Sequence, residues 1–254
     1  MHLTSSVLWG LAVGGSLLAG ATAAALLRLP SKLAATLTAF GGGILFSAVA
    51  LELVPEADDQ AGAALTALGL LAGTLIYVGA DWYLGRDEEM IAMRRDGHAA
   101  AAGRPMPMAL PRDEASRGEA IAVGIFVDGV PESVALGLTI AEGELGVALL
   151  AGILIGNVVE AYGAAQPIIA GGHTKRFAIT LMTAIGFALA FATVLGGTVL
   201  ADASGEVVGT AQAVAGGAVL AVVSIAIVPH AFDEVNRTVA SAMVAGFIAG
   251  YLLS

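Results

Sequence analysis

The chain has no cysteine among its 254 residues, which excludes disulfides, thiolate metal sites and cysteine nucleophiles. Charged residues are also scarce: they make up 13% of the sequence, whereas a soluble domain has about 25%. Only 11 residues are Lys or Arg against 21 Asp or Glu, and the formal net charge is −10. Nucleic-acid binding needs a basic patch, so we expect no nucleic-acid partner.

Apolar residues are in excess, at 57% of the chain with a mean hydropathy of +0.87. A helix that spans a bilayer needs about 20 mostly apolar residues. Eight segments meet this requirement: 5–27, 34–55, 62–84, 118–140, 145–170, 177–201, 207–229 and 237–254. The first lacks the basic start of a cleaved signal peptide, so we expect it to be retained. The sequence predicts an all-α membrane protein, with residues 1–254 forming a single transmembrane domain of eight helices.

The basic residues fall in alternate connections between these segments. Two lie between the first and second, six between the third and fourth, two between the fifth and sixth, and one between the seventh and eighth. Because basic loops stay in the cytoplasm, this pattern predicts that both termini lie outside a cell membrane that the chain crosses many times. The long basic loop, 86–117, is expected to be cytoplasmic and disordered.

Two stretches of the sequence resemble each other. Residues 42–57 read GGILFSAVALELVPEA and residues 216–231 read GGAVLAVVSIAIVPHA, with paired glycines and a V-P-x-A ending at a constant offset of 174. The predicted topology gives the two copies opposite directions. We therefore expect an inverted repeat, helices one to three against six to eight, around a central hairpin of helices four and five. The alternative is that small residues recur only because they let helices pack closely.

Two of the predicted helices carry ionisable or amide side chains near mid-membrane. Asp128 and Glu132 are four residues apart in helix four, and Asn157 and Glu160 are three apart in helix five, so each pair shares one helix face. An ionisable group in the bilayer costs about 2.5–3.5 kcal/mol. Neighbouring carboxylates repel unless a proton or a cation lies between them. Oxygen ligands suit a divalent cation, so we expect these four residues to bind a metal. The alternative is a protonated cluster that joins the helices.

Polar residues at the ends of two further helices are candidates for an ion pathway. Glu52 and Glu56 lie near the predicted outer end of helix two, where they are expected to act as entry ligands or as helix caps. His230 and Asp233 lie near the predicted inner end of helix seven, where an exit or a polar helix end is expected.

The motif segments resemble the ZIP (Zrt/Irt-like) family of metal transporters. Residues 128–133 read D-G-V-P-E-S, similar to the H-N-x-P-E-G motif of that family's helix four. Residues 156–161 read G-N-V-V-E-A, similar to its helix-five motif H-E-x-P-H-E or Q-D-x-P-E-G. The V-P-E at 54–56 and V-P-H at 228–230 look like the ends of its helices two and seven. Eight helices, outward termini and a long loop after helix three also match the family.

The resemblance implies transport of a divalent cation by alternating access. Glu132 and Glu160 match the two glutamates that bridge a metal pair in the family. Asp128 stands for a motif histidine, Asn157 for an acidic ligand, and Gly156 supplies no side chain at a ligand position. These departures imply one site with harder ligands, for zinc, iron, manganese or a similar ion as substrate. No resident cofactor is implied, and the expected partners are the ion, the lipid bilayer and a second copy in a homodimer.

Two other functions use the same carboxylates. One is a proton-coupled carrier of a small organic solute, and the other is a membrane protein that descends from a metal carrier but no longer transports. An enzyme is not expected, because the sequence has no H-E-x-x-H motif and its serines lack a partner histidine at the same depth.

Overall fold

The computed structural model describes residues 2–84, 111–143, 146–199, 203–228 and 237–254, and these residues are helical apart from short turns and connections. The elements are α1 (His2–Leu26), α2 (Ser31–Ala48), η1 (Val49–Leu53), α3 (Val54–Ala61), α4 (Ala63–Leu84), α6 (Pro111–Ala141), α7 (Val147–Ala170), α8 (Lys175–Val199), α9 (Gly205–Val222), η2 (Val223–Ile227) and α11 (Thr238–Leu253). The short elements η1 and η2 are π-helical and continue α2 and α9.

Each of the eight predicted segments is helical in the described part of the chain. Seven helices there are long and apolar enough to cross a membrane, and α11 is a shorter apolar helix of 16 residues. The helix α6 begins at Pro111, so residues 111–117 of the predicted loop are helical, while its membrane-compatible stretch is Ala122–Ala141, close to the predicted 118–140. Its first turn, P-R-D-E, has a Pro and acidic residues that favour a helix start but carry no apolar signal. The rest of that loop lies outside the described residues.

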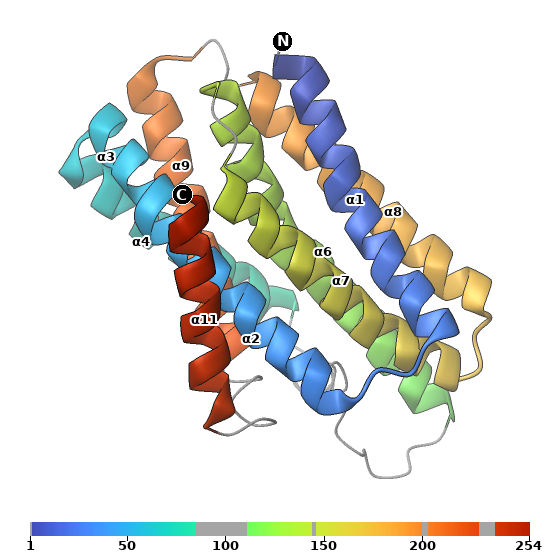
Figure 1. Cartoon of the computed structure of the whole chain (residues 1–254). Helices are drawn as coiled ribbons and strands as arrows, with labels where there is room; N and C mark the ends of the chain where they lie inside the picture. Colours follow the sequence, from blue (N-terminus) through green and yellow to red (C-terminus); the bar gives the residue numbers. More distant parts are fainter. Residues whose placement is uncertain (1, 85–110, 144–145, 200–202, 229–236) are drawn as a thin grey trace.

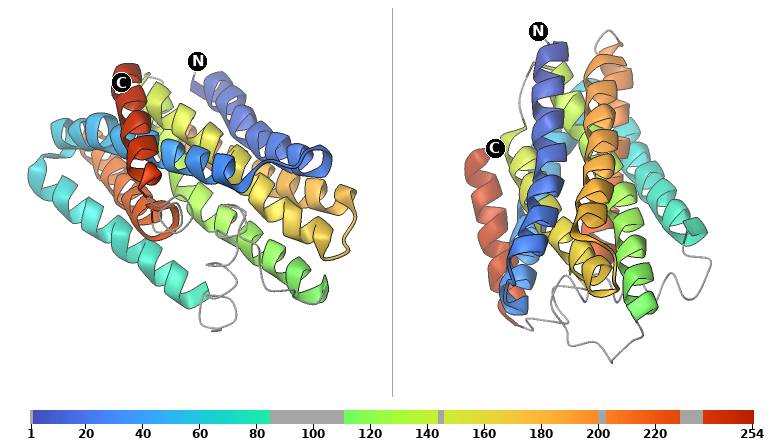
Figure 2. Two further views of the ribbon diagram at one scale, coloured as in Figure 1. Left: turned by 60° about the horizontal axis from the view of Figure 1, so that its bottom comes forward. Right: turned by 90° about the vertical axis from the view of Figure 1, so that its right-hand side faces the viewer.

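The helices surround a central hairpin formed by α6 and α7 (Figure 1). α6 packs against α8 and α9, and α7 packs against α1 and α2. α1 and α8 pair on one side of the hairpin, while α2 pairs with α11 and α4 with α9 on the other (Figure 2). The connections from α1 to α2 and from α7 to α8 lie at one end of the bundle, opposite the start of α1. Helices four and five of the prediction are therefore the middle of the fold.

The outer surface of the bundle is apolar. Leu68, Leu71 and Leu75 of α4 are 62–70% exposed and lie on one helix face by their spacing of three and four residues. Phe187 and Phe191 of α8 are 65% and 63% exposed. Lipid is the solvent that such a surface fits, so the chain is a multi-pass membrane protein.

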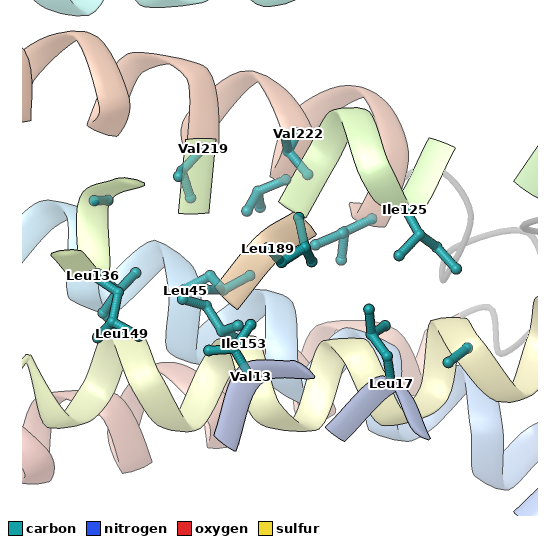
Figure 3. Packing of buried hydrophobic residues seen from close by; sticks show 14 of the residues in the cluster. Val13, Leu17, Leu45, Ile125, Leu136, Leu149, Ile153, Leu189, Val219 and Val222 are labelled. Atoms are coloured by element: carbon teal, nitrogen blue, oxygen red, sulfur yellow. The ribbon is translucent and has the colours of Figure 1, made fainter. Parts of the chain in front are cut away.

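The core lies along the hairpin (Figure 3). Leu136 of α6 and Leu149 and Ile153 of α7 are almost fully buried, together with Leu45 of α2 and Leu189 of α8. Branched side chains from four helices thus fix the relative positions of α6 and α7. These are the two helices that carry the candidate site.

Glycines allow the helix pairs to touch through their backbones. A Cβ added to Gly14 of α1 would lie 2.7 Å from the carbonyl oxygen of Gly186 in α8, and one added to Gly186 would lie 2.8 Å from that of Gly14. Gly43 of α2 lies in the same way against the Met243 carbonyl of α11. Van der Waals contact over bare backbone is the usual basis of helix association in a membrane.

Contacts in the two halves of the chain recur at the offset of 174 that relates the similar sequence stretches. η1 and η2 begin at Val49 and Val223, at this offset. Gly43 has a counterpart in Gly217, which lies against the Leu70 carbonyl of α4. The repeated sequence thus has a repeated backbone irregularity and a repeated helix contact.

α2 packs against η2, and α9 packs against η1, in a reciprocal way. Gly42 lies against the side chain of Ile227, and Gly216 lies beside Leu53. Adding 174 to 42 gives Gly216, and subtracting 174 from 227 gives Leu53. The first contact therefore maps onto the second. The contacts also give α2 and α9 opposite directions.

Candidate carboxylate site in the central hairpin

The four predicted ligands lie in the interior of α6 and α7. Asp128, Glu132 and Asn157 are 3%, 6% and 2% exposed, and Glu160 is partly exposed. The spacing of four in α6 and three in α7 places each pair on one face of its helix. All four residues therefore belong to the two helices of the central hairpin. Their joint role as metal ligands stays a prediction.

The three carboxylates lie within electrostatic reach of one another. Glu132 interacts with the charges of both Glu160 and Asp128, and Glu160 interacts with that of Asp128. Among the described residues, no three His, Cys, Asp or Glu side chains are grouped so that they could hold a metal ion. The described conformation thus brings the carboxylates near each other without joining all three around one point.

A tyrosine from a third helix orients one of the carboxylates. The hydroxyl of Tyr77 in α4 donates a hydrogen bond to Oδ1 of Asp128 at 2.5 Å, and Tyr77 is 3% exposed. A hydrogen bond to a charged acceptor contributes about 1.5–3 kcal/mol. Sequence reasoning missed Tyr77, because no periodicity links residues that are 51 positions apart on different helices.

Two polar side chains beside the carboxylates have buried atoms without a hydrogen-bond partner. These atoms are Nδ2 of Asn157 and Oγ of Ser133, and Ser133 is 0% exposed. An unsatisfied buried polar atom costs about 1–3 kcal/mol. Rotation of the Asn157 amide exchanges its donor and its acceptor, so the side chain can present a hard oxygen ligand. Ser133 follows Glu132 directly in α6, and sequence reasoning did not single it out.

Pro131 modifies the backbone between Asp128 and Glu132. It lies inside α6 and has no N–H, so it cannot bond to the carbonyl of Val127, four residues earlier. That carbonyl oxygen immediately precedes Asp128. The interior of the hairpin therefore offers carboxylate, amide, hydroxyl and backbone oxygens, which are the ligand types that hard divalent cations take.

The candidate entry residues lie apart from this site. Glu52 is in η1 and Glu56 is in α3, one turn further along. Glu56 accepts a hydrogen bond from Nε2 of Gln60 at 2.8 Å, and the same nitrogen donates to Glu142 at the end of α6. The candidate exit residues His230 and Asp233 lie outside the described residues.

Comparisons with known proteins do not assign a function to this site. The chain matches no model of a known protein family and no curated protein sequence. What it binds must therefore be argued from the chemistry of the hairpin. Three carboxylates in adjacent helices of a membrane protein can neutralise a cation or exchange protons.

Proposed function

We propose that this protein carries divalent metal cations across a cell membrane through the site formed by Asp128, Glu132, Asn157 and Glu160. The observation that carries the proposal is a set of three interacting carboxylates, Asp128 and Glu132 buried and Glu160 partly buried, in two adjacent helices of a multi-pass membrane protein. Charged groups are retained at such depth where they serve an ion or proton pathway. A cation lowers the cost of burying them, since it offsets their mutual repulsion.

The architecture supports a transporter rather than a static membrane protein. We infer that α1–α4 and α8–α11 form an inverted repeat related by an approximate two-fold axis. The reciprocal contacts of Gly42 with Ile227 and of Gly216 with Leu53, at the offset of 174, support this relation. Inverted repeats with a site between them are typical of alternating-access carriers, in which one part moves against the other around the ion.

The ligand types favour a hard divalent ion. The site offers oxygen atoms and one amide, with no histidine or cysteine in 111–170, the stretch that includes the hairpin. Carboxylate and carbonyl ligands suit manganese and magnesium, while imidazole and thiolate ligands favour zinc. Within the resemblance to the ZIP family, we therefore expect manganese or iron to be carried at least as well as zinc. The proposal also includes an orientation in which both termini and the Glu142 end of the bundle lie outside. It further includes assembly as a homodimer.

The test is metal uptake into proteoliposomes that contain the full chain. Uptake of Zn²⁺, Fe²⁺, Mn²⁺, Cd²⁺ and Co²⁺ would be compared for the wild type and for the double variant Glu132→Gln with Glu160→Gln. We expect the double variant to lose uptake by more than the roughly 10–100-fold typical of mutations around a metal site. Glu206→Gln serves as the control, because Glu206 is exposed at the start of α9 and far along the chain from the hairpin.

The outcomes separate the candidate functions. Loss of uptake in the double variant but not in the control identifies the carboxylates as the ion pathway. If the folded wild type takes up none of these metals, the proposal fails. Proton uptake driven by a solute gradient in the same vesicles would then identify a proton-coupled carrier.

A further inference from the structure

A second polar group lies at the end of α6, away from the central carboxylates. Glu142 follows the last residue of α6 and accepts hydrogen bonds on both of its carboxylate oxygens. Gln60 of α3 donates to Oε1, and Gln212 of α9 donates from Nε2 to Oε2 at 2.5 Å. Gln60 also donates to Glu56 at 2.8 Å. We call Glu56, Gln60, Glu142 and Gln212 the Glu142 cluster.

Gln212 provides an independent indication that the cluster can bind a ligand. The side chain is 0% exposed, and its Oε1 is buried without a hydrogen-bond partner. The Nε2 atom of the same amide group bonds to Glu142, and a half-turn of the amide exchanges the two atoms and brings the oxygen to the Glu142 side. A buried amide oxygen with both lone pairs unused is costly, at about 1–3 kcal/mol. It is also a hard ligand of the kind that completes oxygen coordination of a cation.

The sequence segments that carry the cluster contain acidic residues. Described segments at this end of the bundle, 52–60, 139–143 and 205–212, contain no Lys, Arg or His. Glu56 and Glu142 are joined through one neutral amide group, which supplies hydrogen bonds but no charge. Two partly buried carboxylates linked in this way are stabilised by a positive charge beside them.

The cluster is distinct from the site in the hairpin. Glu142 follows Glu132 by ten residues, which is roughly 15 Å along a helix axis. A cation is bound at about 2–2.6 Å by its ligands. One ion therefore cannot be shared between the cluster and the central carboxylates.

We propose that Glu56, Glu142 and the amide oxygen of Gln212 form a second binding site, for a hard divalent cation of the manganese or calcium class. Gln60 acts as a positioning residue that holds the two carboxylates together. With only oxygen ligands and two carboxylates, the site takes such ions in preference to zinc and leaves coordination positions for water. The second site is separate from transport, and the proposal of this site does not depend on the central site.

The test is a titration of the full chain in detergent with Mn²⁺, with free Mn²⁺ measured by electron paramagnetic resonance. The double variant Glu132→Gln with Glu160→Gln keeps one Mn²⁺ per chain, and adding Glu142→Gln to it removes that ion. Ca²⁺ competes for this ion, whereas an equal concentration of Zn²⁺ competes less. Glu206→Gln, on the same helix as Gln212, leaves the titration unchanged.

Gln212→Glu separates an ion site from a structural hydrogen bond. In an ion site the added carboxylate tightens Mn²⁺ binding, by about tenfold, because ligand charge sets affinity. In a purely structural cluster it only adds repulsion against Glu142. The proposal is overturned if the double variant binds no Mn²⁺, or if Gln212→Glu leaves Mn²⁺ affinity unchanged or weaker. Should Glu142→Gln fail to fold, the Gln212→Glu titration decides alone. Metal uptake that depends on Glu132 and Glu160 is unaffected by either of these results, so the two proposals fail separately.

Discussion

The contact between α1 and α8 allows a sharp test of how this bundle is held together. A Cβ on Gly14 would lie 2.7 Å from the Gly186 carbonyl oxygen, whereas carbon–oxygen contacts between helices lie at about 3.3–3.6 Å. Gly14→Ala must therefore separate the helices locally by roughly 0.6–0.9 Å. Overpacking of this kind costs about 1–3 kcal/mol. Gly15, the next residue of the same helix, has no atom within 4 Å of its added Cβ and is the matched control.

The two variants should differ by the packing term alone. Both gain the helix propensity of Ala over Gly, about 1 kcal/mol, so Gly14→Ala should be less stable than Gly15→Ala by about 1–3 kcal/mol. For a chain of this size each kcal/mol shifts the melting temperature by about 2–4 °C. We expect Gly14→Ala to melt about 2–12 °C below Gly15→Ala in detergent, measured by circular dichroism.

A double variant tests whether separation of α1 from α8 causes this loss of stability. Gly186→Ala meets the Gly14 carbonyl oxygen at 2.8 Å from the other side of the same contact. Once one methyl group has separated the helices, the second costs less, so the double variant should lose less stability than the sum of the single losses. Equal melting temperatures for Gly14→Ala and Gly15→Ala would refute the close backbone contact itself.

Two further predictions concern the central site. Tyr77→Phe removes the hydrogen bond to Asp128 and should raise the KM for Mn²⁺ uptake by roughly 10–100-fold, as is typical for residues that orient a metal ligand; an unchanged KM would mean that Tyr77 only fills space. Gly156→His adds a nitrogen ligand where an added Cβ meets no atom within 4 Å, and should shift competition uptake from Mn²⁺ toward Zn²⁺. Gly129→His, whose Cβ would meet a methyl group of Leu189 at 2.6 Å, should instead lower the melting temperature.

The positions of the helices could be predicted from the sequence because the bilayer imposes them. Each crossing requires about 20 apolar residues, so hydropathy alone locates the segments within a few residues. The start of α6 was missed since its first turns, 111–117, are polar and extend beyond any hydrophobic signal. The π-helical turns were also missed, because V-A-L-E-L in η1 fits an α-helix equally well.

The candidate site could be predicted only in part, for a similar reason. Spacing along one helix places Asp128 beside Glu132, and Asn157 beside Glu160. It does not reveal which side chains arrive from other helices. Tyr77 and Gln212 reach α6 carboxylates that are 51 and 70 residues away in sequence. Only tertiary packing brings these donors to their acceptors.

These two donors also bear on how the hairpin would move in a transport cycle. Tyr77 belongs to α4 and Gln212 to α9, two helices that pack against each other. Together they hold α6 at two levels, at Asp128 and at Glu142. Sliding of the hairpin past α4 and α9 must break both hydrogen bonds, at about 1.5–3 kcal/mol each. A cation bound at Asp128, in the proposed transport site, would compete with Tyr77 for the charge of that carboxylate and weaken that bond. In the proposed transporter, ion binding would thereby lower the barrier to the movement that carries the ion.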